Sequence, residues 1–117
     1  MNTSRNRIAN KRASDPIDQM IYEKGLRITQ VMPVKKQDSL IVLLSNGNAI
    51  NVRLSFFPRL KKASQLQLDK WQLISKGIGI EWSQLDEDLS LKGLIQQLIV
   101  QNTLRYVSGE SNFAMAA

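Results

Sequence analysis

Residues 40–54 read LIVLLSNGNAINVRL. The first five are apolar without interruption, which is typical of a central strand covered on both faces. Ile50, Val52 and Leu54 then alternate with polar residues, as in a half-buried strand. Between the two runs, Asn46-Gly47 is the residue pair that supplies the two positive-φ positions of a type I′ turn. The stretch therefore predicts a β-hairpin centred on Asn46-Gly47.

Two elements are expected before the hairpin. Residues 26–34 are rich in β-branched side chains and end near Pro33, which cannot donate a ladder hydrogen bond and suits the end of a strand. Ile17 to Lys24 has apolar residues at helical spacing, and Gly25 ends that pattern. We expect a short helix followed by a strand.

A helix is expected after the hairpin, over about residues 59–70. Pro58 favours the first turn of a helix. Ser64 lies inside the segment as a candidate cap, so two short helices joined there are as compatible with the pattern as one continuous helix. We expect Phe56 and Phe57, just before the proline, to anchor the core and not to form a base-stacking platform.

Two further strands are expected over residues 71–75 and 78–82, because apolar runs flank the turn residues Lys76-Gly77. Gly79 indicates a bulge, a close backbone approach or a tryptophan packed over it, and we favour packing. The tryptophans at positions 71 and 82 lie beside apolar neighbours, so both are predicted to be structural.

The last expected element is an amphipathic helix over about residues 90–106, with Ser90 as its N-cap. Three acids precede it, Asp86, Glu87 and Asp88. They are the one carboxylate cluster in the sequence, and hard cations prefer such oxygens. The cluster lacks the spacing of a calcium loop, so we expect helix capping and a solvated surface instead of a metal site.

These elements predict one α+β domain built on a small antiparallel sheet. The chain has 117 residues, 43% of them hydrophobic and 22% charged, which suits a single globular unit. We expect a flexible basic arm over residues 1–15, the folded domain over 16–108 and a flexible tail over 109–117.

The composition restricts the chemistry that the chain can perform. It has no cysteine and no histidine, so thiolate nucleophiles, thiolate metal sites and histidine acid–base catalysis are absent. Catalysis by carboxylates, lysine or serine alone is left open by the composition. We predict no catalytic residue, metal or cofactor, and a protein that is not an enzyme. No apolar run reaches the length of a secretory leader core or a membrane span, which predicts a cytoplasmic protein without membrane association.

The net charge of +6 is concentrated near the N-terminus. Four of the sixteen basic residues and none of the ten acidic ones lie in the first fourteen positions, which leaves the remainder near +2. The arm and a second basic patch could contact nucleic-acid phosphates. The alternative readings are a solvated tail and an ordinary solvent-facing helix surface. The candidate nucleic-acid residues are Arg5, Arg7, Lys11, Arg12, Arg59, Lys61 and Lys62.

The order of segments resembles a small bacterial family known as domain of unknown function 2442. The likeness covers about residues 26–96 and rests on residues 43–47, 57–60 and above all on Trp71–Ile74 and the run from Gly77 through Trp82 to Ser90. Family members commonly have histidine where this chain has Glu81. The resemblance implies a compact β-rich domain with flanking helices, without established catalytic activity.

Members of that family look like the antitoxin half of two-gene modules or occur joined to DNA-binding helix-turn-helix domains, and this chain has no such appended domain. Our first hypothesis is therefore a non-catalytic protein-interaction or regulatory module, antitoxin-like, whose partner is a small toxin or a regulatory protein. The second is a nucleic-acid-binding accessory protein that uses the arm and the basic patch. Whether the chain forms a homo-oligomer is left open.

Overall fold

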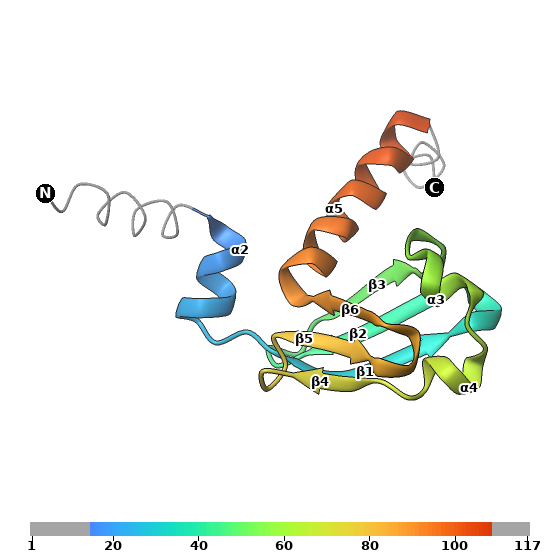
Figure 1. Cartoon of the computed structure of the whole chain (residues 1–117). Coiled ribbons are helices and arrows are strands. Elements are labelled where there is room, and N and C mark those ends of the chain that lie inside the picture. Colours follow the sequence, from blue (N-terminus) through green and yellow to red (C-terminus); the bar gives the residue numbers. More distant parts are fainter. Residues whose placement is uncertain (1–14, 109–117) are drawn as a thin grey trace, which may run out of the picture.

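The computed structural model describes residues 15–108, arranged as an α+β fold with two small antiparallel sheets and flanking helices (Figure 1). The predicted arm and tail lie outside the described residues, except for Asp15. That residue is the N-cap of the first described helix, so it belongs to a helix and not to the predicted arm. No helix within residues 15–108 is long and apolar enough to cross a membrane.

The first sheet has the order β1-β2-β3, with β1 at Ile28–Val34, β2 at Ser39–Leu44 and β3 at Ala49–Arg53. Strand β2 is central, as predicted. Its side chains alternate between buried and half-buried. The predicted cover on both faces is therefore only partly present, because one face of β2 meets the core and the other remains partly open to solvent.

The hairpin between β2 and β3 is confirmed, but its turn is not of the predicted type. Gly47 has a φ of 89°, whereas Asn46 is not among the positive-φ residues. The Gly47 amide donates to the Leu44 carbonyl, and the Leu44 amide donates to the Asn48 carbonyl. This is a three-residue hairpin loop. Such a loop consists of a type I turn followed by a single residue with positive φ, and here that residue is Gly47.

Two short helices follow β3, α3 at Pro58–Lys62 and α4 at Gln65–Leu68. Ser64 separates them and forms a capping box with Gln67, so of the two predicted alternatives the interrupted one is observed. Phe57 packs against the core while Phe56 remains 38% exposed, so the prediction that both aromatics anchor the core is wrong for Phe56.

The second sheet has the order β4-β5-β6, with β4 at Gln72–Ile74, β5 at Gly79–Trp82 and β6 at Glu87–Ser90. Strand β6 was not predicted, because its acidic residues have low strand propensity. Trp82 is buried, as predicted, and its indole nitrogen donates to the Leu68 carbonyl at 2.8 Å. This hydrogen bond satisfies the polar atom of a buried indole.

Two glycines in the β4–β5 hairpin allow close contacts. A Cβ on Gly77 would lie 2.5 Å from the Ile28 carbonyl oxygen, and the Gly77 carbonyl accepts from the Ile28 amide at 2.8 Å. Gly79 is crowded by the Ile74 side chain and the Leu89 carbonyl. Packing thus explains Gly79 as expected, but the side chain over it is isoleucine and not tryptophan.

The long helix α5 (Leu91–Ser108) begins where β6 ends. The Ser90 hydroxyl accepts from the Gly93 amide at 2.9 Å, as expected of an N-cap. Near this end lie α2 (Pro16–Asp18) and the π-helix Gln19–Glu23, which brings Ile21 into the core. Figure 1 shows that α5 leaves the sheets and extends beyond them.

Both sheets contribute to one core, in which the inner side chains of the first sheet join those of β5 and the start of α5. Its most deeply buried members are Leu40, Val42, Val52, Leu60, Leu68, Ile80 and Leu91.

Candidate binding surfaces

The outer face of the first sheet is apolar at its centre. Met32 lies opposite Ile41 in the strand register, and Ile41 lies opposite Asn51. Leu43 and Ala49 form the neighbouring pair. Ile41 and Leu43 are half-buried, and Met32 is 39% exposed, so the described elements cover this face only in part. We call it the outer face: Gln30, Met32, Val34, Ser39, Ile41, Leu43, Ala49, Asn51 and Arg53.

A groove of about 710 Å³ lies where the outer face meets the C-terminal half of α5. Its lining residues are Gln37, Asp38, Ser39, Asn51, Arg53, Leu98, Gln101 and Asn102. Three of these belong to the outer face, so the groove opens onto it. The volume lies within the range of natural ligand sites, but the lining is mostly polar, whereas small-molecule pockets are mostly apolar. The groove thus suits a polar segment of a larger partner.

The two charged groups of the groove differ in their partners. The Asp38 carboxylate accepts from the Ser55 amide at 2.8 Å and from the Ser55 hydroxyl at 2.7 Å. Arg53 is exposed and forms no ion pair with another described residue. Its guanidinium can therefore donate hydrogen bonds to a carboxylate from outside the domain.

Two glutamine amides occupy the edges of the first sheet. The Gln101 side chain accepts from the Arg53 amide and donates to the Asn51 carbonyl. Gln65 does the same on β1, where it accepts from the Lys35 amide and donates to the Pro33 carbonyl. Each amide thus bonds the same pair of edge groups, two residues apart, that a neighbouring strand would bond.

The structure separates the predicted basic patch into two parts. The Arg59 guanidinium donates to the Asp86 carbonyl and lies 3.6 Å from the Asp86 carboxylate and 3.9 Å from that of Glu87. Arg59 is thus engaged by the acidic turn before β6. That it acts together with Lys61 and Lys62 on nucleic acid stays a prediction.

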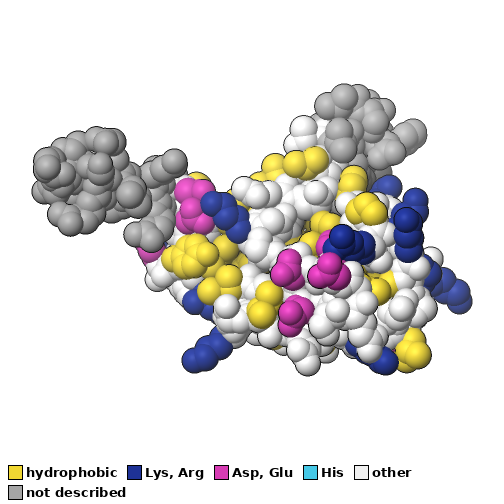
Figure 2. Space-filling view, in the orientation of Figure 1, with side chains coloured by type: hydrophobic (Ala, Val, Ile, Leu, Met, Phe, Trp, Pro, Cys, Tyr) yellow, Lys and Arg dark blue, Asp and Glu magenta, His cyan; other side chains and the backbone are white. Residues whose placement is uncertain are grey.

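Lys61 and Lys62 instead lie with two lysines that the sequence analysis did not select. The Lys35 ammonium donates to the Lys61 carbonyl at 2.8 Å, and Lys36 is its neighbour in the 3₁₀ turn after β1. We call Lys35, Lys36, Lys61 and Lys62 the lysine cluster. Figure 2 shows dark-blue side chains gathered at this end of the molecule, around α3 and the β1–β2 connection.

The remaining predicted nucleic-acid residues lie outside the described part of the chain: Arg5, Arg7, Lys11 and Arg12. The structure therefore gives them no position.

The acidic residues border a smaller hollow of about 220 Å³, which is lined by Glu81, Trp82, Ser83, Asp86, Glu87 and Asp88. Magenta side chains gather near the middle of the face seen in Figure 2, over the second sheet. Asp88 lies opposite Glu81 in the register of that sheet. Within residues 15–108, no acid, histidine or cysteine group is arranged to hold a metal ion.

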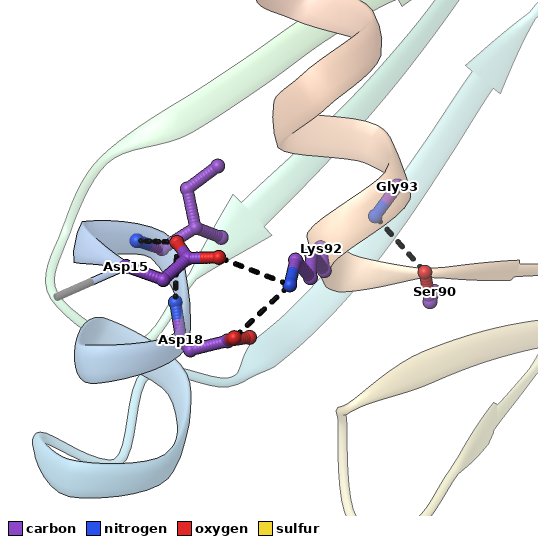
Figure 3. Close-up of polar contacts among 6 residues, drawn as sticks. Asp15, Asp18, Ser90, Lys92 and Gly93 are labelled. Carbon is purple, nitrogen blue, oxygen red and sulfur yellow. Dashed lines mark hydrogen bonds and ion pairs between the residues drawn. The ribbon is translucent and has the colours of Figure 1, made fainter. Parts of the chain in front are cut away.

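An ion-pair cluster joins the first helix to α5 (Figure 3). The Lys92 ammonium lies 3.0 Å from the Asp18 carboxylate and 3.2 Å from that of Asp15. The hydrogen bond from Lys92 lowers the pKa of Asp15, and the hydrogen bonds to Asp18 and Asp15 raise the pKa of Lys92. Each of the three charged groups has an oppositely charged partner within the cluster, which indicates a structural role.

Comparison with known proteins supports the fold. The sequence matches the family described as "Protein of unknown function (DUF2442)" over residues 28–99. A crystal structure of a protein of unknown function from Rhodospirillum rubrum is 31% identical, with a TM-score of 0.55 over 61% of this chain and 86% of that one. No curated protein matches the chain.

A solution structure of an uncharacterized protein from Chromobacterium violaceum is also similar. It is 22% identical, with a TM-score of 0.57 over 74% of this chain and 78% of that one. At this identity the likeness concerns the fold alone.

Proposed function

The chain belongs to the family of proteins of unknown function DUF2442, and we propose that it is a non-catalytic protein-interaction module. The observation that carries the proposal is the outer face of the first sheet, which leads into the groove beside α5.

The composition of the outer face supports a protein partner. Protein interfaces have a core poor in charge and a polar rim. Here Met32, Ile41 and Leu43 form the centre, and the polar residues lie around them. Arg53 is the one charged residue of the outer face. A partner would therefore bring an apolar surface with a carboxylate placed against Arg53.

We propose further that the partner is a small toxin and that the module masks it in the cytoplasm. The family resemblance motivates this form of the proposal. The absence of cysteine agrees with a reducing compartment. The absence of histidine and cysteine agrees with a module that lacks catalysis of its own.

The test uses two methionines of equal exposure. The partner is first captured from the host with the tagged full chain, identified and purified, and its affinity is then measured by titration calorimetry. Met32 and Met20 are both 39% exposed, but only Met32 lies on the outer face. We expect Met32→Lys to weaken binding by at least tenfold and Met20→Lys to change it less than twofold.

Thermal melting of both variants checks that each remains folded. An equal effect of the two substitutions, or none of either, would contradict the assignment of the outer face. Light scattering of the purified chain adds a second criterion. If the chain is a dimer that Met32→Lys separates, the face binds a second copy and the toxin proposal fails.

A further inference from the structure

We infer that the lysine cluster is a contact site for the phosphate backbone of single-stranded nucleic acid. This site is separate from the outer face and from the groove. It differs from the patch expected from the sequence, because Arg59 is excluded from it and Lys35 and Lys36 are added.

The cluster is assembled by a specific tertiary contact. The Lys35 ammonium is held by the Lys61 carbonyl, although 26 residues separate the two in sequence. The Lys35 amide is held by Gln65, so the backbone on which Lys36 lies is also fixed. The four exposed lysines thus lie on two segments that this contact brings together.

No described carboxylate forms an ion pair with this surface. None of the four lysines has an ion-pair partner within 4.0 Å among residues 15–108. Two acids lie in the adjoining segments, and both are engaged by neutral donors: Asp38 by Ser55 and Asp69 by Gln65. Like charges brought together repel one another, and the phosphates of a bound polyanion offset that repulsion. Release of the counterions of the polyanion favours the binding further.

Phe56 favours a single strand over a duplex. It is 38% exposed and lies two residues before α3, the helix that carries Lys61 and Lys62. Proteins bind single-stranded nucleic acids through basic side chains that contact the phosphates and through aromatic rings on which the bases stack. A stacked base in a duplex is not accessible to such a ring. None of the described residues forms a groove-reading helix beside the cluster, so we expect binding without sequence preference.

The probe is a fluorescein-labelled oligothymidine of about 20 nucleotides, followed by fluorescence anisotropy at several salt concentrations. The test variant of the full chain is Lys61→Ala with Lys62→Ala. The control variant is Lys24→Ala with Lys76→Asn. It removes the same charge from exposed lysines elsewhere, and asparagine tolerates the positive φ of position 76.

We expect wild-type binding that weakens with salt, and at least a tenfold loss of affinity in the test variant at about 50 mM salt. Each phosphate contact on a single strand contributes about 0.7 to the slope of log K against log salt, so two lost contacts should lower it by about 1.4. The control variant should stay within twofold of wild type.

Three results would overturn the inference. The first is no binding by the wild type at low salt, and the second is an equal loss in test and control variants, which would show that only net charge matters. The third is a preference for a duplex of the same length, or for vesicles with about 30% phosphatidylserine, over the oligothymidine. Phe56→Leu should weaken oligothymidine binding further, and an unchanged affinity would contradict the single-strand assignment.

Discussion

Gly47 and Gly77 have similar backbone conformations, with φ angles of 89° and 102°, but very different surroundings. A Cβ at Gly47 would meet nothing within 4 Å, whereas one at Gly77 would lie 2.5 Å from the Ile28 carbonyl oxygen. We expect Gly47→Ala to cost about 1 to 2 kcal/mol of unfolding free energy, from left-handed strain alone. Gly77→Ala should cost clearly more, because it also breaks the contact between the sheets.

Urea denaturation of both variants measures the difference, and Gly47→Asn is the control, since asparagine tolerates this conformation. Equal losses at the two glycines would mean that the β4–β5 turn can move away from Ile28.

At the same scale, the sequence predicted the position of the first turn but not its geometry. Asn-Gly occurs both in two-residue turns and in three-residue loops that end in glycine, so the pair alone does not distinguish them. Ser75 and Lys76 both have positive φ, which nothing in their residue types indicated. Their conformation is set by the pairing of β4 with β5 on either side.

At the scale of elements, Lys92 connects α5 to the helix that begins after Asp15. Because the pKa of Asp15 is lowered in the folded state, its contribution to stability is present above the ordinary aspartate pKa, about 3.9, and is lost as pH falls through the lowered value. Because the pKa of Lys92 is raised, its contribution is present below about 10.4 and is lost as pH rises through the raised value.

Lys92→Met keeps most of the side-chain volume and removes the charge. We expect it to reduce the pH dependence of the urea midpoint at both ends, between about pH 2 and 4 and above about pH 10. An unchanged profile in both windows would show that the cluster does not hold the two helices together.

The glutamine side chains on the sheet edges lead to a second prediction for the elements. Replacing both Gln65 and Gln101 by alanine should cost about 0.5 to 1.5 kcal/mol per lost hydrogen bond and leave strand edges free for other chains. We expect lower stability in urea and faster aggregation by light scattering. Gln96→Ala, an exposed position on α5, should change neither. Aggregation at the wild-type rate in the double variant would contradict an edge-protecting role.

The elements that the sequence missed are those that depend on partners far along the chain. Strand β6 consists of Glu87–Ser90 and forms because β5 pairs with it. Its acidic residues alone favour a turn or a helix cap. By contrast, the helix of α5 and the β2–β3 hairpin were predicted correctly, because helical spacing and strand alternation are local signals.

At the scale of the whole molecule, the two sheets share one core and the Gly77–Ile28 hydrogen bond also joins them. We therefore expect a single cooperative unfolding transition. Trp71 and Trp82 lie beside and within the second sheet, so their fluorescence reports on it, while far-UV circular dichroism reports on the whole chain. The two transitions should coincide in urea. Separate midpoints would show that the sheets unfold independently.

The candidate surfaces were the least predictable part of the molecule. The sequence selected Arg59, Lys61 and Lys62 from their proximity along the chain. The fold turns Arg59 toward Asp86 and brings Lys35 to Lys61, over separations of 27 and 26 residues. The outer face was missed for a related reason. An uninterrupted apolar run predicts cover on both sides, and only the three-dimensional arrangement shows which side remains partly open.

The occupied edges of the first sheet also restrict how another molecule can join it. Near Pro33 and Lys35 on one margin, and near Asn51 and Arg53 on the other, an incoming strand would find the main-chain groups already bonded. At that end, another strand therefore cannot be added to the sheet by main-chain hydrogen bonds. Another molecule can instead pack on the face of the sheet, where layers stack about 10 Å apart. At that end of the sheet, we therefore expect a partner of the outer face to pack against it as a preformed layer, a folded sheet or helix, and not to add a strand to it.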